Sequence, residues 1–194
     1  MLEKLLQWDR DTFIYLNGLG IEAHDAFWSI VTQTSTWIPL FLLFGYLLVS
    51  KYGRQEGVYR ILTILLMVAL VLIVTKLTKE WVGRLRPNND TEINTLIRIL
   101  KSPDDYSFFS GHAATSFSIT LLAFLFLRER LRWTALFFAW PIVFSMSRIF
   151  VGVHYPIDIL TGMFFGLLSA FLFYRLHPVL SALCSRLSHR ERAR

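Results

Sequence analysis

Two histidines and an aspartate are the residues of this sequence best suited to chemistry. His154 and Asp158 lie four residues apart, so a helical turn beginning at Pro156 would bring their side chains together. An aspartate beside an imidazole can hold one ring proton and stabilise positive charge on the ring. His112 is an ionisable residue near the start of an apolar run, a position that favours a functional role. The spacing alone does not show which histidine would attack a substrate.

Basic residues that could bind an anion flank both histidines. Lys79, Arg86 and Arg148 could neutralise the oxygens of a phosphoryl group, and arginine offers a planar, forked contact to them. Ser110 and Gly111 lie where a helix is expected to begin, so free backbone N–H groups there could face the same anion. These residue types favour a phosphate site that needs no metal and no cofactor.

Long uncharged runs indicate which elements position these residues. Of the 194 residues, 54% are hydrophobic, and the charged residues gather in short clusters between apolar stretches, as is typical of a membrane protein. We expect five membrane-spanning helices, at residues 26–50, 61–75 with an extension towards 81, 107–127, 133–147 and 159–174. The predicted fold is all-α, a polytopic membrane helical bundle that forms one domain over residues 1–194, with its motif core at residues 79–158.

The remaining segments predict the orientation of the bundle. Residues 1–22 mix leucines with charged residues, which suits an amphipathic helix on the membrane surface. Lysine and arginine are enriched in three segments that we expect to be cytoplasmic: residues 50–60, residues 128–132 and a basic tail at residues 177–194. With five spans, residues 76–106 and 150–157 fall on the other side. The candidate site residues therefore gather on the non-cytoplasmic side.

Three of these segments resemble the signature of the type 2 phosphatidic acid phosphatase superfamily, which also includes vanadium haloperoxidases. That signature reads Lys-x6-Arg-Pro, Pro-Ser-Gly-His and Ser-Arg-x5-His-x3-Asp. The segments here are Lys79-x6-Arg86-Pro87, Phe109-Ser110-Gly111-His112 and Ser147-Arg148-x5-His154-x3-Asp158. Phe109 stands where proline is usual. Because the proline contributes no polar group, we expect altered loop packing and little loss of chemistry.

The resemblance implies a role for each candidate residue. His154 would attack phosphorus and form a phosphohistidine, while Asp158 holds the proton on the other ring nitrogen. His112 would protonate the leaving oxygen and then act as base on the attacking water. The residues expected to bind the phosphate are Lys79, Arg86, Ser110, Gly111 and Arg148.

The resemblance also implies a lipid phosphate that reaches the site from the bilayer. Undecaprenyl diphosphate is the first choice, since short bacterial members of the family often act on it; lipid A phosphates and phosphatidylglycerophosphate follow. Residues 88–105 are expected to lie over the site and to select among these lipids. The implied location is a bacterial inner membrane, with the site on the periplasmic or extracellular side. A lipid-linked phosphotransferase and a small transporter are the alternatives, no nucleic-acid partner is expected, and the oligomeric state is left open.

Other polar residues are expected to be structural. Lys76 and Arg84 suit interfacial anchors at the end of a span. The histidines at positions 24, 177 and 189 lack neighbours of the kind that surround His112 and His154. Cys184 is the only cysteine, so it predicts neither an internal disulfide nor a thiolate metal site.

Overall fold

The computed structural model describes the backbone of residues 1–192 and the side chains of residues 1–185. The predicted basic tail is therefore only partly covered, and four of its arginine side chains lie outside the described residues: Arg186, Arg190, Arg192 and Arg194. Within the described residues the secondary structure is helical, without strands. The predicted all-α class is confirmed.

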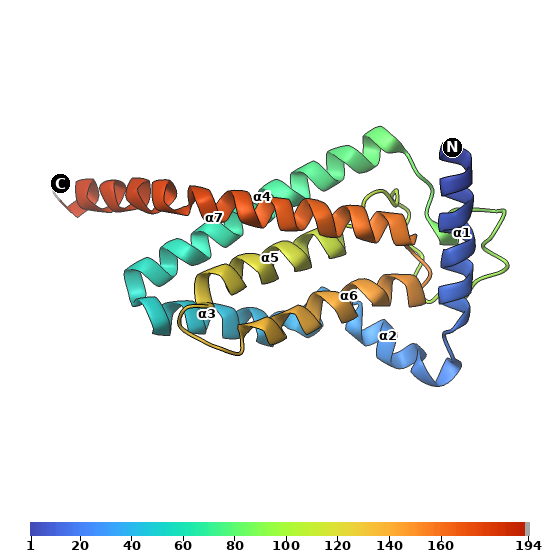
Figure 1. Ribbon diagram of the computed structural model, residues 1–194, viewed down its shortest axis with the longest axis horizontal. Helices are drawn as coiled ribbons and strands as arrows, with labels where there is room; N and C mark the ends of the chain where they lie inside the picture. Colours follow the sequence, from blue (N-terminus) through green and yellow to red (C-terminus); the bar gives the residue numbers. More distant parts are fainter. Residues whose placement is uncertain (193–194) are drawn as a thin grey trace.

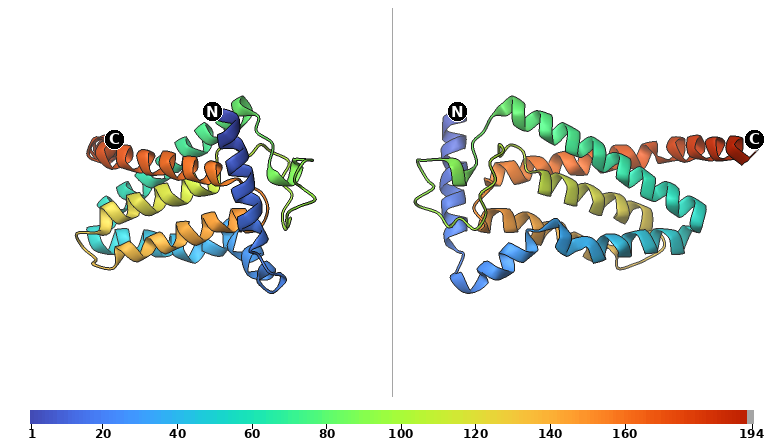
Figure 2. Two further views of the ribbon diagram at one scale, coloured as in Figure 1. Left: turned by 45° about the vertical axis from the view of Figure 1, so that its right-hand side comes forward. Right: turned by 180° about the vertical axis from the view of Figure 1, so that it is seen from behind.

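Five apolar helices form a bundle, and a sixth helix lies across one end of it (Figure 1). The bundle helices are α3 (Ile38–Tyr52), α4 (Arg54–Val82), α5 (Gly111–Leu127), α6 (Ala139–Phe150) and α7 (Pro156–Arg192). α5 contacts all four of the others and contributes many fully buried side chains. The crossing helix, α1 (Leu2–Gly18), covers the end where α4 and α6 finish and α5 and α7 begin, as both views of Figure 2 show.

Several of these helices suit a membrane. Three described segments are long and apolar enough to cross one: Thr34–Tyr52, Arg54–Asn89 and Pro156–Ser185. Gly111–Leu127 and Thr134–Phe150 are apolar but shorter. Large apolar side chains such as Leu65, Leu72 and Phe164 are exposed on the outside of the bundle, where lipid can cover them. The count of five membrane-spanning helices remains a prediction.

The first predicted span is not one continuous helix. α2 (Asp25–Val31) ends before a short 3₁₀ turn, Thr34–Trp37, and α3 starts after it. Pro39 lies in the first turn of α3, where its missing N–H is tolerated, whereas inside a longer helix it would remove a hydrogen bond. The side chain of Trp37 donates to the carbonyl of Val31, and so satisfies an orphan group at the end of α2.

α5 and α7 approach each other so closely that glycine is required between them. A Cβ atom at Gly162 would lie 2.5 Å from the carbonyl oxygen of Ser110, and one at Gly166 would lie 2.3 Å from that of Ala114. The amide of Ser110 donates to the carbonyl of Asp158 at 2.9 Å. The beginnings of the two helices are therefore held together by backbone contacts.

α1 presents both apolar and polar side chains to the bundle. Asp9, Phe13 and Asn17 follow one another at four-residue spacing and are fully buried. Asn17 donates to the carbonyls of Arg98 and Ile149 and accepts from the amide of Arg98, which fixes α1 to the loop between α4 and α5. Four large apolar side chains near its start are exposed: Leu2, Leu5, Leu6 and Trp8. The helix expected within residues 1–22 is present, and its place on a membrane surface remains a prediction.

Candidate active site

The three motif segments meet at the end of the bundle that α1 covers. Lys79 lies in the last turn of α4, Arg86 follows in the loop after that helix, Arg148 lies in the last turn of α6 and His154 precedes α7. A cavity of about 750 Å³ opens between α3, α4, α5 and α6. Five predicted site residues line it: Lys79, Arg86, Gly111, His112 and Arg148. The polar end of the cavity continues into a long apolar part formed by residues such as Phe41, Leu48, Ile61, Ile64 and Val68.

Lys79 and Arg86 share one carboxylate, that of Asp105. Nζ of Lys79 bonds one carboxylate oxygen, and Nη2 of Arg86 donates to the other at 2.8 Å. Nε of Arg86 also donates to the backbone carbonyl of Asp105 at 2.9 Å. Burial alone would raise the pKa of Asp105, but the bond from Lys79 and the charge of Arg86 hold that pKa below its ordinary range. The two cations therefore already bind a carboxylate anion.

Arg148 is a buried cation with unused hydrogen-bonding capacity. Its side chain is 6% exposed, and Nη1 donates to the hydroxyl of Thr32 in the break after α2. Its Nε has no hydrogen-bond partner among the described residues. Because a buried charged donor without a partner is costly, this arrangement suits an anion in the adjoining cavity.

The start of α5 offers backbone donors to the cavity. Ser110 is the N-cap of the helix, and its hydroxyl accepts from the amide of Ala113 at 3.4 Å. Gly111 and His112 follow in the first turn, where N–H groups have no intrahelical partner, and both line the cavity. Of the two residues predicted to bind phosphate here, Gly111 lies at the cavity, whereas the buried Ser110 caps the helix.

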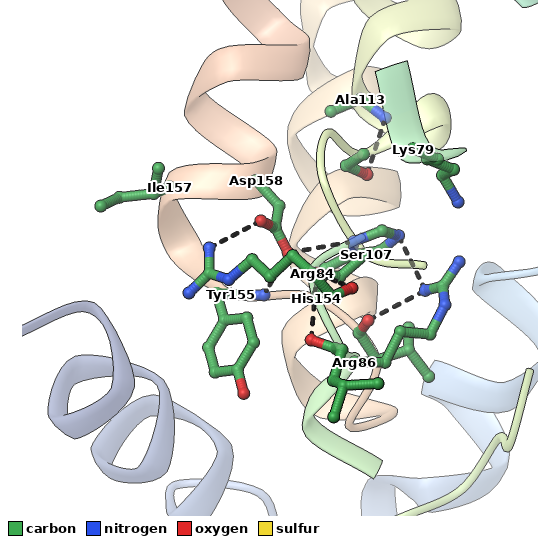
Figure 3. Close-up of polar contacts among 12 residues, drawn as sticks. Lys79, Arg84, Arg86, Ser107, Ala113, His154, Tyr155, Ile157 and Asp158 are labelled. Atoms are coloured by element: carbon green, nitrogen blue, oxygen red, sulfur yellow. Dashed lines mark hydrogen bonds and ion pairs between the residues drawn. The ribbon is translucent and has the colours of Figure 1, made fainter. Parts of the chain in front are cut away.

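The contacts of His154 define its tautomer. Its Nε2 lies 3.0 Å from Nη1 of Arg86, which can only donate, so Nε2 must carry a lone pair. Its Nδ1 lies 3.4 Å from Oδ2 of Asp158, which can accept the Nδ1 proton (Figure 3). Burial, together with the positive charges of Arg86, Arg148 and Lys79, holds the pKa of His154 well below its ordinary value of 6.5. The ring is therefore a neutral imidazole whose free electron pair is on Nε2.

Both carboxylate oxygens of Asp158 accept hydrogen bonds. Its Oδ2 accepts from the amide of Tyr155 at 3.0 Å, and its Oδ1 accepts from Nη1 of Arg84 at 2.8 Å. Asp158 lies in the first turn of α7, so the helical turn predicted from Pro156 brings its carboxylate back to His154. Among the described residues, no group of three or more histidine, cysteine, aspartate or glutamate side chains could hold a metal ion.

Comparison with known proteins assigns this arrangement to a family. The model of the PAP2 superfamily matches residues 60–181, nearly two thirds of the chain and all three motif segments. The chain belongs to the PAP2 superfamily. Its similarity to curated members extends over most of its length. It is 29% identical over 187 residues to a lipid A 4'-phosphatase of Bacteroides thetaiotaomicron, covering 94% of this chain and 82% of that protein.

Two further PAP2 proteins are similar to it. An undecaprenyl-diphosphatase of Sulfolobus acidocaldarius is 30% identical over 159 residues, which cover 81% of this chain and 68% of that protein. The crystal structure of a transmembrane PAP2-type phosphatidylglycerolphosphate phosphatase from Bacillus subtilis has the same fold, with a TM-score of 0.70 and 22% identity. That match covers 88% of this chain and 84% of the crystallised one. The chain is thus a PAP2 membrane lipid phosphatase.

Two residues of this PAP2 site were not predicted as members of it. Arg84 was interpreted as an interfacial anchor, but its guanidinium bonds the carboxylates of Asp158 and Asp9 and lies over the ring of Tyr155. Asp105 was assigned only to the loop above the site. No motif position marked either residue, and a basic residue after an apolar run is ordinarily an anchor.

Phe109, at the motif position where proline is usual, is buried against α7. Its side chain is 4% exposed and packs against Phe165 of α7, with ring centroids 5.1 Å apart. The residue therefore contributes to the core, and its ring packs against α7 rather than contributing a polar group to the site.

Proposed function

We propose that the protein hydrolyses a lipid phosphate ester or diphosphate through a phosphohistidine, without a metal ion. The observation that carries the proposal is the cavity, which joins Lys79, Arg86 and Arg148 to a long apolar channel between helices. A phosphoryl group needs cations and donors around its oxygens, and a lipid tail needs an apolar surface. Both requirements are met in one continuous space.

In the first step the free electron pair on Nε2 of His154 attacks phosphorus. As the Nε2–P bond forms, the bond from phosphorus to the leaving oxygen breaks. His112, which the negative charge of the bound phosphate keeps protonated, transfers its proton to that oxygen. Arg86 moves from Nε2 to an oxygen of the phosphoryl group. Lys79 and Arg148 stabilise the remaining negative charge, and Asp158 stabilises the imidazolium.

In the second step water replaces the histidine. His112, now neutral, removes a proton from a water molecule, whose oxygen attacks phosphorus while the Nε2–P bond breaks. Inorganic phosphate leaves, His154 regains its electron pair, and His112 is again protonated. The apolar walls around the cavity limit the access of other nucleophiles.

Undecaprenyl diphosphate is the substrate that the cavity supports best. The apolar part of the cavity is a groove lined by side chains of α3, α4, α5 and α6, which suits a flexible hydrocarbon chain attached to a diphosphate. The similarity to an undecaprenyl-diphosphatase over 81% of this chain supports the same assignment.

Lipid A is the second candidate, supported by a separate observation. Nε1 of Trp140 is buried, lines the groove and has no hydrogen-bond partner among the described residues. An acylated lipid carries ester and amide oxygens that could accept this N–H, whereas a polyprenyl chain carries none. The similarity to a lipid A 4'-phosphatase over 94% of this chain agrees with this alternative.

The proposed location follows from the positive-inside rule. Residues 50–60 and 128–132 lie at the end of the bundle far from the site, and their basic residues support a cytoplasmic location for that end. The site then opens at the periplasmic or extracellular side, at the level of the lipid headgroups.

The substrate can be identified with purified protein in nanodiscs. Phosphate release would be measured from undecaprenyl diphosphate, lipid A and phosphatidylglycerophosphate, with and without a chelator. We expect the highest kcat/KM with undecaprenyl diphosphate and no effect of the chelator. A higher kcat/KM with lipid A would select the second candidate, and loss of activity with chelator would refute the metal-free mechanism.

The fate of the phosphoryl group separates a hydrolase from a phosphotransferase. In ¹⁸O-labelled water a hydrolase releases labelled inorganic phosphate. Transfer of the phosphoryl group to an added lipid or sugar alcohol, without labelled phosphate, would show that water is not the acceptor. No phosphate release from any lipid would favour the transporter.

A further inference from the structure

A chain of three charged side chains, of which the two carboxylates are buried, connects α1 to the candidate catalytic pair. Nη1 of Arg84 donates to Oδ1 of Asp158 at 2.8 Å, and Nη2 of the same guanidinium donates to Oδ2 of Asp9 at 2.7 Å. Both carboxylates are 0% exposed. Asp9 lies outside the residues that the PAP2 model matches, and Arg84 is not a position of the three motifs.

The contact requires an arginine. One planar guanidinium bonds two carboxylates through different nitrogens, and its carbon lies 3.9 Å from the centroid of the Tyr155 ring. A lysine ammonium could not combine this fork with stacking on the ring. Figure 3 shows Arg84 reaching Asp158 from the face opposite His154.

Arg84 determines how Asp158 is presented to His154. One carboxylate oxygen of Asp158 faces Nδ1 of His154 and accepts from the amide of Tyr155, while the other is held by Arg84. A carboxylate held at both oxygens cannot rotate about its side-chain bonds. The imidazole proton on Nδ1 therefore keeps a fixed acceptor, and Nε2 keeps its electron pair.

Asp9 performs two functions in this arrangement. Its Oδ1 accepts from the amide of Ile157 at 2.9 Å, which attaches α1 to the first turn of α7. Its Oδ2 forms an ion pair with Arg84 and so neutralises the charge of that guanidinium. Burial raises the pKa of Asp9 above its ordinary value, and the hydrogen bonds from Ile157 and Arg84 offset only part of this rise. With Asp9 ionised, two carboxylates and one guanidinium carry a net charge of −1 beside a ring that becomes positive when it is phosphorylated.

We propose that Arg84 is a positioning residue for the Asp158–His154 pair and that Asp9 of α1 supplies its counter-charge. The N-terminal helix is then part of the active site. This inference rests on the proposed function, because it assigns the two residues a role in the reaction of His154.

Kinetics of the full-length protein test the inference. Asp9→Asn preserves shape and the bond from Ile157 but removes the charge, and Arg84→Gln removes the cation. We expect kcat for phosphate release to fall about 10- to 100-fold in each, the range for groups that orient a catalytic histidine. KM and the inhibition constant of inorganic phosphate should change less than about threefold, because Lys79, Arg86 and Arg148 are untouched.

Three further variants complete the design. Asp11→Asn makes the same chemical change at an exposed position of α1 and should keep wild-type kcat. Arg84→Lys should recover part of the kcat lost in Arg84→Gln. The double variant Asp9→Asn/Arg84→Gln should lose less than the product of the single losses, because both act through one carboxylate.

The outcomes separate this inference from the proposed function. Wild-type kcat in Asp9→Asn, or multiplicative losses in the double variant, would overturn the inference. A fall in kcat matched by an equal loss of phosphate binding would show a general structural effect and would also overturn it. Full activity in His154→Gln would refute the proposed function itself.

Discussion

The two ends of the bundle each bury a histidine among charged residues, but they balance those charges differently. At the far end, Nε2 of His177 lies 3.0 Å from Glu56 and its Nδ1 lies 2.9 Å from the hydroxyl of Thr63. Arg60 pairs with the same glutamate at 2.9 Å, and Ser181 donates to it. One arginine therefore faces one carboxylate, and both nitrogens of the imidazole have an oxygen partner.

At the site end the charges are unbalanced. Beside the cavity, Lys79 and Arg86 share the carboxylate of Asp105, Arg148 forms no ion pair among the described residues, and Nε2 of His154 lies against Arg86. Both ends of the bundle bury polar and charged side chains, so burial of such side chains alone does not identify the site. An excess of positive charge beside a cavity, together with an imidazole whose electron pair faces one of these cations, distinguishes the site end.

The largest expected effect is the loss of the nucleophile. His154→Gln should lower kcat about 10⁴-fold or more, because glutamine cannot replace the imidazole as the proposed nucleophile. Rapid quenching with a ³²P-labelled substrate should trap an acid-labile phosphoenzyme in the wild type and none in the variant. Equal labelling of both proteins would show that the nucleophile is another residue.

Substitution of Arg148 tests whether the excess of cations at the site contributes to catalysis. Arg148→Lys keeps the charge but loses the fork that reaches Thr32 with one nitrogen and the cavity with another. We expect kcat/KM to fall about 100-fold, the range for loss of one donor to a developing charge. A loss below threefold would mean that Arg148 contributes only charge.

The pH profile tests the state of the imidazole. Because the pKa of His154 is well below 6.5, the ring stays neutral and nucleophilic as pH falls through 6.5. We expect kcat/KM, corrected for titration of the substrate, to be maintained at about pH 5.5. A histidine with an ordinary pKa would have lost about tenfold there. An acid limb near 6.5 would contradict the electrostatic argument.

Substitution of Asp105 tests whether its carboxylate competes with the substrate phosphate for Lys79 and Arg86. Asp105→Asn removes the negative charge held by Lys79 and Arg86, so we expect KM to fall about threefold with little change in kcat. Measurement at low ionic strength gives the clearest difference. A rise in KM would show instead that Asp105 holds Arg86 in place.

The smallest effect on activity is expected at the far end. His177→Gln should leave kcat within about twofold but lower the midpoint of thermal denaturation, because a buried polar partner is lost, at a cost of about 1–3 kcal/mol. A large loss of kcat without a change in that midpoint would contradict the structural role assigned to the far end.

The sequence predicted the residues that meet at the site better than the residues that position them through hydrogen bonds and ion pairs. Lys79, Arg86, His112 and Arg148 could be predicted because residue type and spacing matched a known signature. Asp9 could not, because its partner Arg84 is 75 positions away and nothing in a surface-helix pattern marks one acid for burial.

Helix boundaries show the same limit. The apolar run at residues 26–50 predicted one span, since composition does not reveal that hydrogen bonds from Thr36 and Trp37 end α2 early. The break places Thr32 beside Arg148, a tertiary contact that neither segment encodes alone. By contrast, the expectation that a helix begins at Ser110 and Gly111 is confirmed, because Ser110 is the N-cap of α5.

The contact of α5 and α7 at Gly162 and Gly166 has a consequence for redesign. Because no side chains separate them here, α5 and α7 cannot slide or move apart without breaking backbone contacts. α5 begins at Gly111, and α7 follows His154. Space for a bulkier tail must therefore come from elsewhere along the cavity, for example where α3 and α4 line it. Mutagenesis aimed at a new tail length should therefore vary the groove-facing positions of those two helices, such as Gly45 and Ile61, and keep both glycines.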